Sequence, residues 1–398
     1  MHDLAPQLQD LEDRDLLRRR RLVAGLQGAE VRVEGRSVLC FASNNYLGLA
    51  SDPEVVEASR KALEEGGASA AASPLISGHM EAHEELEREI ALWLDCEAAL
   101  VFGSGYHANI GVIAALVGAG DAVFSDALNH ASLIDGCRLA RASVVIYDHL
   151  DLSDLEEKLR STPARRRLIV TDSVFSMDGD VVPLEGLCDL AERYGAWLML
   201  DEAHAVGVFG EQGAGLASAR GVGARVPIRM GTLGKALGSY GAFVAGSRAL
   251  IDWLLNRARS YVFSTALPPA TIGAARAAIA ITRRDVSRRE RLWSNARRLH
   301  RGLRAGGLSL PALESSIVPV LLGAAGDAVA VGHEALAHGV WAPAIRPPTV
   351  PPGTSRLRLT PLATHSAAQI DRATEVIVRA AGGGSNGVRP PTEERRDG

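Results

Sequence analysis

The chain has 398 residues, of which 47% are hydrophobic and 23% charged, and its formal net charge is -4. This composition is typical of a globular protein with a full hydrophobic core, and it excludes a disordered or fibrous chain. The slightly acidic balance argues against a dedicated nucleic-acid binder, because phosphate contacts need a basic surface.

The cysteines are few and widely spaced, and no CxxC pair occurs among Cys40, Cys96, Cys137 and Cys188. Reduced thiols are therefore expected, with neither a disulfide framework nor a metal site. The N-terminus has no apolar core of signal-peptide length, and no later run approaches the roughly 18 apolar residues of a membrane span. We expect a cytoplasmic protein with no membrane partner.

Short apolar runs alternate with amphipathic helical patterns along the first 280 residues. The expected strands are residues 98–102, 122–126, 143–148, 167–172 and 197–201. The expected helices include one that Pro53 opens after Asp52, one that buries Leu86, Ile90, Trp93 and Leu94, one capped by Ser153 with Glu156, and one with Pro183, Leu184, Leu187, Cys188 and Ala191. This alternation predicts an α/β fold with a mostly parallel sheet covered on both faces.

The pattern changes near Arg283. A strongly basic helix follows, with Leu292, Ala296, Leu299 and Leu303 on one stripe, and then the strand-like runs "SSIVPVLLG" and "SRLRLTP". We therefore expect an N-terminal arm (1–45), a large α/β domain (46–282) and a C-terminal α+β domain (283–381). The glycine-, proline- and charge-rich end (382–398) is expected to be a disordered tail.

Unusual polar residues stand where several expected strands end: Asp172, Asp201 with His204, and Thr232 with Lys235. In an open parallel sheet, ligands bind outside the carboxyl ends of the strands. These side chains come from separate strands but should converge on one edge of the sheet.

Two glycine-rich stretches invite a nucleotide-binding interpretation. A P-loop at Lys235 is excluded, because the pattern needs Gly at 229 and Ser or Thr at 236, where the chain has Arg229 and Ala236. In "FGSGYHAN", the spacing of Gly103, Gly105 and Ala108 fits a dinucleotide site after the first strand. A general anion site at a helix N-terminus and a plain tight turn remain alternatives there.

The surroundings of Lys235 favour a covalent role. In "RMGTLGKALGSYG" the lysine stands among glycines and small apolar residues, which let a group approach the backbone and desolvate the amine. If the amine holds pyridoxal 5'-phosphate (PLP), a carboxylate, a planar stacking group and an anion cradle are also needed. Asp201, His130 and the 103–106 turn with Thr232 are the candidates.

Seven stretches in order carry a resemblance: "FASNNYLGLA", "SDALNHASLIDG", "VTDSVFSMDGD", "LMLDEAHAVGVFGEQGAG", "GTLGKALGSYGAFVAG", "FSTALPPA" and "IRPPTVPPGTSRLRLT". With them, the chain resembles the α-oxoamine synthases over roughly residues 15 to 380. These are PLP enzymes of fold type I, like aspartate aminotransferase. The resemblance implies a homodimer whose active sites lie at the subunit interface.

The resemblance also implies residue roles. Lys235 would form the internal aldimine and then act as the base, Asp201 would pair with the pyridinium nitrogen, and His130 would stack on the ring. The further cofactor contacts would be Ser104, Gly105, Tyr106, Ser176, His204 and Thr232, with Ser264 and Thr265 from the second subunit. For substrates, Arg346 would bind the amino-acid carboxylate, with Arg358 as a second cation and Asn44 at the entrance. Arg18 would take the acyl-chain carboxylate, although a solvated helix end explains it equally well.

The implied reaction is a decarboxylative condensation of an amino acid with an acyl-CoA. "FSTALPPA" and "IRPPTVPPGTSRLRLT" are most like the member that joins L-alanine to pimeloyl-CoA in biotin biosynthesis. "SDALNHASLIDG" and "GTLGKALG" are equally typical of glycine C-acetyltransferase. A non-catalytic partner subunit and an NAD-dependent oxidoreductase using the "GSGYHA" turn are the alternatives from other classes.

The chain departs from the family in two places. "GASAAASPLISGH" has Ala71, Ala72 and Pro74 where the family has glycines and an arginine, and this loop is expected near the acyl-CoA side. Proline fixes φ and removes a donor, and an arginine would supply a bidentate contact. Acyl specificity is therefore the property in doubt. Asp172 also stands where a glutamate is common.

Overall fold

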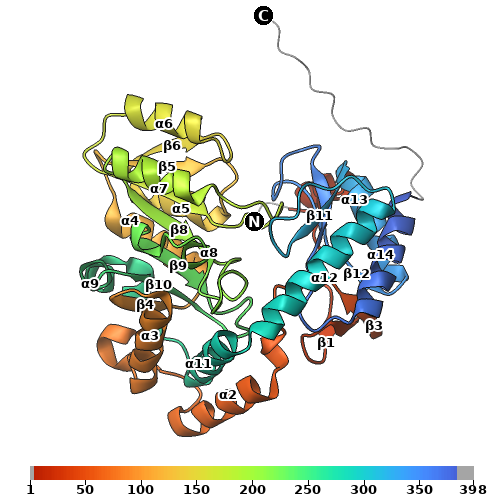
Figure 1. Ribbon diagram of the computed structural model, residues 1–398, viewed down its shortest axis with the longest axis horizontal. Coiled ribbons are helices and arrows are strands. Elements are labelled where there is room, and N and C mark those ends of the chain that lie inside the picture. Colours follow the sequence, from red (N-terminus) through yellow and green to blue (C-terminus); the bar gives the residue numbers. More distant parts are fainter. Residues whose placement is uncertain (1–3, 383–398) are drawn as a thin grey trace, which may run out of the picture. The chain divides into compact units, whose positions relative to one another are not determined.

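The computed structural model describes residues 4–382 of the chain. Its internal contacts divide the chain into two compact units (Figure 1). The large unit is residues 44–292, and the small unit combines residues 1–43 with residues 293–398, of which 4–43 and 293–382 are described.

The large unit is built on a seven-stranded sheet in the order β4-β10-β9-β8-β7-β5-β6. Its strands are β4 (Ala98–Phe102), β5 (Ala122–Asp126), β6 (Ser143–Tyr147), β7 (Arg167–Asp172), β8 (Trp197–Asp201), β9 (Ile228–Thr232) and β10 (Ala242–Gly246). Only β10 runs antiparallel to its neighbours, β4 and β9. The predicted mostly parallel sheet is confirmed, and the five expected strands are β4 to β8.

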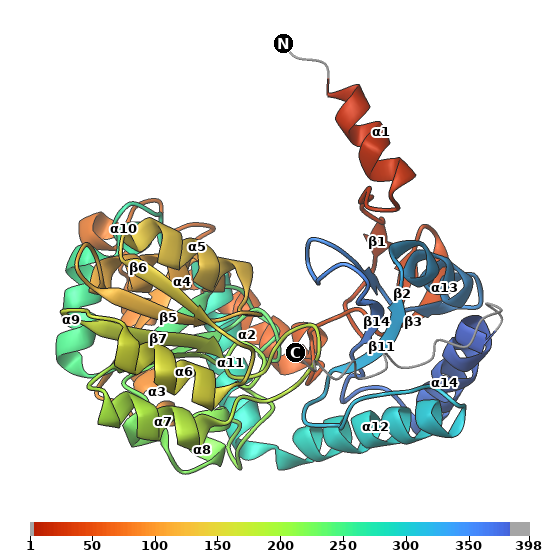
Figure 2. The ribbon, with the colours of Figure 1, turned by 90° about the horizontal axis from the view of Figure 1, so that it is seen from above.

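Helices cover both faces of this sheet. Figure 2 shows the strands between a layer that holds α4 and α5 and a layer that holds α6 and α7. The helices of the unit are α2 (Pro53–Gly66), α3 (Glu81–Leu94), α4 (Gly105–Leu116), α5 (Ala131–Ala140), α6 (Leu152–Ser161), α7 (Leu184–Arg193), α8 (Leu216–Ala219), α9 (Arg248–Arg257), α10 (Arg259–Val262) and α11 (Pro269–Arg284). Short helical turns are η1 (Leu49–Ser51), η2 (Pro74–Gly78) and η3 (Gly223–Arg225). The core lies between strands and helices, where residues such as Val112, Leu133 and Met199 are buried.

Local sequence explains where these helices begin. Asp52 caps α2 by accepting the N–H of Glu54, with Pro53 in the first turn, as expected. The predicted buried face of α3 is confirmed as well. The capping box at Ser153 was wrong: Asp151 caps α6, because its carboxylate accepts the N–H groups of Ser153 and Asp154 at 2.8 and 3.0 Å.

The predicted basic helix is α12 (Val286–Ala305), and its stripe of Leu292, Ala296, Leu299 and Leu303 is fully buried. The division between the two units falls within this helix, between residues 292 and 293. A continuous helix therefore connects them, where the sequence suggested a boundary at 283.

The small unit contains two sheets, in the orders β1-β2-β3-β12 and β11-β14-β13. Its elements are α1 (Ala5–Asp13), β1 (Val23–Ala24), β2 (Glu30–Val33), β3 (Arg36–Cys40), β11 (Val318–Gly323), α13 (Ala325–Ala337), β12 (Val340–Trp341), β13 (Ala344–Ile345), β14 (Ser355–Leu359) and α14 (Ala367–Gly382). The expected separate arm instead joins the C-terminal residues, because β3 pairs in parallel with β12 and Phe41 packs into the same core as Leu299 and Leu357.

The predicted tail lies outside the described residues, apart from its first residue, Gly382. Among residues 4–382, no helix combines the length and the apolar character that crossing a membrane requires.

Candidate active site

Three neighbouring strands of the large unit end in polar residues at one edge of the sheet. Asp172 ends β7, Asp201 ends β8 and Thr232 ends β9. Asp172 pairs with Asp201 in register, and Asp201 pairs with Met230 on β9. The predicted convergence of these residues is confirmed.

Lys235 follows β9 on a glycine-rich turn, and its amine begins a chain of hydrogen bonds. Nζ lies 2.8 Å from Nε2 of His204, whose Nδ1 lies 2.8 Å from the Tyr46 hydroxyl. The Tyr46 hydroxyl donates to Oδ1 of Asn44 at 3.3 Å. A phenol has one proton, and Tyr46 uses it on Asn44, so the Tyr46 oxygen must accept a hydrogen bond from Nδ1 of His204. The Nε2 atom of the neutral imidazole then accepts from the lysine amine. The half-buried amine is thus held at a fixed place.

A glycine allows the His204 turn to approach the lysine turn. Gly207 has φ +82°, and a Cβ built on it would lie 2.6 Å from the Cβ of Ala236. Any side chain there would both strain the backbone and displace the turn that carries Lys235.

Asp201 lies in a buried polar network that the sequence did not predict. Its carboxylate is 3% exposed and accepts the Asn109 amide at 2.7 Å and the Ala203 N–H at 2.9 Å. Asn109 also donates to Oγ of Ser132 at 2.8 Å, and Ser132 Oγ lies 2.7 Å from Nδ1 of His130. Neither donor to Asp201 carries a charge, so the buried carboxylate is suited to a cationic ligand group.

His130 is the N-cap residue of α5 beside this network, and the residue is exposed. Burial of the ring lowers its pKa, although the Asp201 charge acts in the opposite direction. The His130 N–H donates to Oδ2 of Asp172 at 2.7 Å. Burial, together with the Asp201 charge, raises the pKa of Asp172. A neutral imidazole with an accessible face is suited to stacking on a flat ring.

The N-terminus of α4 offers an anion site at this edge of the sheet. Ser104 caps the helix by accepting the His107 N–H at 3.2 Å, and Gly105 and Tyr106 form the first turn, whose N–H groups have no partner within the helix. The Thr232 hydroxyl is engaged within its own loop, because it donates to the Gly241 carbonyl at 3.1 Å and accepts the Gly234 N–H at 3.2 Å.

The remaining predicted cofactor residues lie on two loops of the large unit. Ser176 is half-buried in the segment after β7. Ser264 and Thr265 follow α10 and line a small cavity of about 20 Å³ together with Pro74 and Glu87.

The predicted substrate arginines all belong to the small unit. Arg346 donates to the Leu17 carbonyl at 2.6 Å, while its buried Nε has no hydrogen-bond partner. Burial, together with the nearby Arg18 charge, lowers the pKa of Arg346. Arg346 lines a cavity of about 540 Å³ with Arg19 and other residues of the same unit. Arg18 is exposed and donates to Thr349 Oγ1 at 3.0 Å, and Arg358 is buried on β14.

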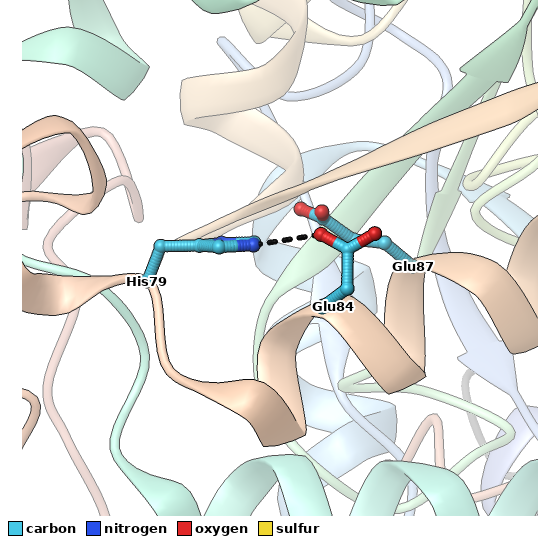
Figure 3. A group of neighbouring side chains, drawn as sticks. All are labelled: His79, Glu84 and Glu87. Atoms are coloured by element: carbon cyan, nitrogen blue, oxygen red, sulfur yellow. Dashed lines mark hydrogen bonds and ion pairs between the residues drawn. The ribbon is translucent and has the colours of Figure 1, made fainter.

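A second group of ionisable side chains lies at the start of α3, where Figure 3 shows His79, Glu84 and Glu87. One nitrogen of His79 and one carboxylate oxygen from each glutamate, the atoms that could bind a metal ion, lie within 4.8 Å of one another. His79 Nε2 is 3.0 Å from Glu84, and Glu87 accepts the Val101 N–H at 2.8 Å. Burial raises the pKa of Glu87 to about 7. These hydrogen bonds, with Glu84 in the first turn of α3, account for the cluster as a stabilising feature of this helix.

The donor set at the sheet edge fits PLP. Lys235 offers an amine, Asp201 a buried carboxylate with only neutral donors, His130 a flat ring, and the α4 N-terminus an anion cradle. Sequence reasoning found each of these but missed Asn109, Ser132 and Tyr46. An asparagine inside the otherwise apolar stretch "NIGVIAAL" was the available sign, since a buried amide needs partners.

Comparison with known proteins agrees with this site. The model of the aminotransferase class I and II family matches residues 36–377, so the chain belongs to this family. Fold and site together define a PLP-dependent transferase of fold type I. The predicted fold class and cofactor are confirmed.

Individual proteins within this class are similar to the chain over most of its length. The 8-amino-7-oxononanoate synthase of Anaeromyxobacter dehalogenans is 50% identical over 368 residues, which cover 92% of each chain. The serine palmitoyltransferase of S. paucimobilis, solved with a bound PLP–myriocin aldimine, is 32% identical with a TM-score of 0.91, covering 96% of this chain and 97% of that one. The 8-amino-7-oxononanoate synthase of Francisella tularensis is 27% identical with a TM-score of 0.75, covering 87% and 98%.

Proposed function

We propose that the chain catalyses the condensation of L-alanine with pimeloyl-CoA, releasing CoA and CO2 and giving 8-amino-7-oxononanoate. The observation that carries this proposal is the arrangement of Lys235 against His204, beside a buried Asp201 that lacks a charged donor. The relatives named for this reaction match nearly the whole chain.

PLP, when bound, supplies a sink for the electrons released as bonds at the amino-acid Cα break. In our proposal, Lys235 holds the cofactor through its amine and afterwards moves the proton at Cα. Asp201 keeps a proton on the pyridine nitrogen, and the Asn109 amide orients that carboxylate. His130 covers one face of the ring, and His204 and Ser176 contact its hydroxyl side.

The remaining residues bind the negatively charged groups of the cofactor and the substrates. Ser104, Gly105 and Tyr106 at the α4 N-terminus take the phosphate, with Thr232 beside them. Arg346 binds the amino-acid carboxylate, because its buried Nε has no hydrogen-bond partner and its guanidinium stays charged. Arg358 and Arg18 are further cationic contacts, and Asn44 lines the entrance through its bond from Tyr46.

We also propose that the active enzyme is a homodimer. Large apolar side chains on the η2 turn and after α10 are exposed: Leu75 at 46%, Ile76 at 81% and Phe263 at 71%. Exposed apolar groups of this kind favour a protein interface. Ser264 and Thr265 follow Phe263 directly, so the same contact would carry them to the partner's cofactor phosphate. The free cysteines are consistent with a reducing, cytoplasmic location.

The substrate assignment is tested by CoA thiol release from the PLP-loaded protein. Alanine with pimeloyl-CoA is expected to give rapid release, and glycine with acetyl-CoA little. A preference for glycine and acetyl-CoA would instead assign the chain to glycine C-acetyltransferase activity. Lys235→Ala serves as the control, and we expect its turnover to fall by about 10²- to 10⁴-fold or more.

The proposal that each active site contains residues of both subunits is tested by mixing two inactive proteins. These are Lys235→Ala and the double variant Ser264→Ala/Thr265→Ala. A mixed dimer then holds one intact site, so subunit exchange should restore up to about a quarter of wild-type activity. No recovery after verified exchange would contradict a site built from both subunits.

A further inference from the structure

His149 lies between two carboxylates of the large unit, one at the end of β5 and one on the loop after β7. Its Nδ1 is 2.8 Å from Oδ1 of Asp126, and its Nε2 is 2.6 Å from Oδ2 of Asp180. The Phe175 ring packs edge-on against the imidazole, with centroids 4.4 Å apart. The histidine is therefore held on three sides, and it donates to both carboxylates only when both ring nitrogens are protonated.

Asp126, at the end of β5, organises the turn that leads to His130. Its side chain is fully buried and accepts the Leu128 N–H at 2.8 Å and the Leu150 N–H at 3.0 Å. One carboxylate thus fixes the segment before His130 and the segment that carries His149. Three hydrogen bonds, one of them from His149, set its position.

Asp180 belongs to the loop that carries Ser176. The Phe175 N–H donates to the Asp180 carbonyl at 3.0 Å, and Val174 pairs with Val181, so residues 174–181 fold back on themselves around Ser176. The buried Oδ1 of Asp180 has no hydrogen-bond partner. The histidine is therefore the chief support of this carboxylate.

We propose that His149 is a positioning residue that ties the His130 turn to the Ser176 loop through Asp126 and Asp180. The inference rests on the proposed function, in which His130 covers one face of the cofactor ring and Ser176 contacts the hydroxyl side of the ring. A doubly protonated His149 holds both loops, and a neutral one can donate to only one carboxylate. The bridge thereby sets the spacing of two groups that contact the cofactor, without touching it.

The electrostatics agree with this geometry. Burial alone would lower the pKa of His149, but the hydrogen bonds and charges of Asp126 and Asp180 raise it to about 9. These two carboxylates are the titratable groups that act on the ring. Because the folded-state pKa lies above the ordinary 6.5, the stabilisation is complete below about 6.5 and is lost as the pH rises through about 9.

The test compares wild type with His149→Gln and Asp180→Asn. We expect the dissociation constant for PLP at pH 7.5 to rise about 10- to 100-fold in His149→Gln, and kcat to fall by a similar factor while KM changes little. In wild type, PLP affinity and the unfolding midpoint of the cofactor-free protein should both decline as the pH approaches 9. Asp180→Asn should move that decline to lower pH, and His149→Gln should abolish it.

His338→Gln is the matched control, since His338 forms an exposed pair with Glu334 in the small unit. It should leave PLP affinity and the pH dependence unchanged. Identical alkaline midpoints in wild type and Asp180→Asn would overturn the proposal, as would unchanged PLP affinity in His149→Gln. If His149→Gln does not fold, the isosteric Asp180→Asn still decides. A wild-type protein that binds no PLP would refute the proposed function, whereas the pH dependence of the cofactor-free protein tests the bridge separately.

Discussion

Two basic groups of the large unit are paired with carboxylates, whereas two basic groups of the small unit are not. In the large unit, Arg229 and Glu202 form an ion pair in which both side chains are 1% exposed, and His149 is held by two carboxylates. In the small unit, His365 is buried against Phe41, and Arg346 keeps an unpaired Nε. Burial lowers the pKa of His365 to about 4, whereas the pKa of His149 is raised to about 9.

The difference shows that burial alone does not set the charge of a group. A buried base keeps its proton when the fold also provides a carboxylate, and gives it up when the fold does not. Glu202 supplies the carboxylate for Arg229, and Asp126 and Asp180 supply the carboxylates for His149. Arg346 cannot give up its proton near neutral pH, so its unpaired donor remains available for an anionic ligand.

The largest effect is expected from breaking the pair in the large unit. Arg229 donates to Glu202 at 2.9 and 3.0 Å and to the Leu94 carbonyl at 3.0 Å, while Glu202 also accepts the Ala217 N–H. Arg229→Met leaves a buried carboxylate unpaired and should cost about 3–5 kcal/mol in the free energy of unfolding. Urea unfolding followed by fluorescence measures this change.

The double variant Arg229→Met/Glu202→Leu should recover most of that loss, because no charge is left unpaired. Arg225→Met is the control, since Arg225 pairs with exposed Asp189 and Glu192 and its removal should have only a small effect. Equal losses at Arg229 and Arg225 would show that burial of the pair does not matter.

Acid should destabilise the small unit through His365. Its folded-state pKa of about 4 lies below the ordinary 6.5, so the unfolded chain binds more protons between these values. The contribution of neutral His365 to the free energy of unfolding is therefore fully present above about pH 6.5. It is lost as the pH falls, and the total loss below pH 4 is about 3 kcal/mol. The unfolding free energy measured from pH 7 to pH 4 gives the slope, and His365→Phe should flatten it. If the unfolding free energy of His365→Phe depends on pH as steeply as that of wild type, other titratable groups cause the dependence.

Arg346→Gln should raise KM for the amino acid by about 10- to 100-fold, because a hydrogen bond to a charged group contributes about 1.5–3 kcal/mol. The value of kcat should change much less if binding is uniform in the ground and transition states. Arg301→Gln, an exposed site on α12, is the matched control in steady-state kinetics. An unchanged KM in Arg346→Gln would remove Arg346 from the substrate site.

The smallest effect is expected from the amide beside Asp201. Asn109→Ala removes a donor from a buried carboxylate and should cost about 1–3 kcal/mol in stability. It should also weaken PLP binding, because the carboxylate loses its orientation. Thermal unfolding and a PLP titration measure the two effects. Asn256→Ala is the comparison, since that amide is exposed and bonds only within its own helix; an equal loss there would contradict the special role of Asn109.

Much of the large unit was predictable because its information is local. Alternating apolar runs placed β4 to β8 within a residue of their observed bounds, and Asp52 before Pro53 marked the start of α2. Residues at the ends of parallel strands meet by topology alone, which is why Asp172, Asp201 and Thr232 could be assigned to one edge. The antiparallel strand β10 was not among the expected strands, since its apolar run is short and the glycine-rich stretch before it was interpreted only as the turn that carries Lys235.

The sequence by itself determined the fold type and the cofactor, and it indicated Lys235, Asp201 and His130 as candidate site residues, because strand periodicity, glycine turns and ordered motifs lie in neighbouring residues. Only the tertiary structure decided which distant side chains complete the network. Asn109 reaches Asp201 across 92 positions, and residues 4–43 join residues 293–382 in the small unit. Such contacts depend on how elements pack, and the carboxylates that packing brings to a buried base decide whether it keeps its charge, as His149 and His365 show.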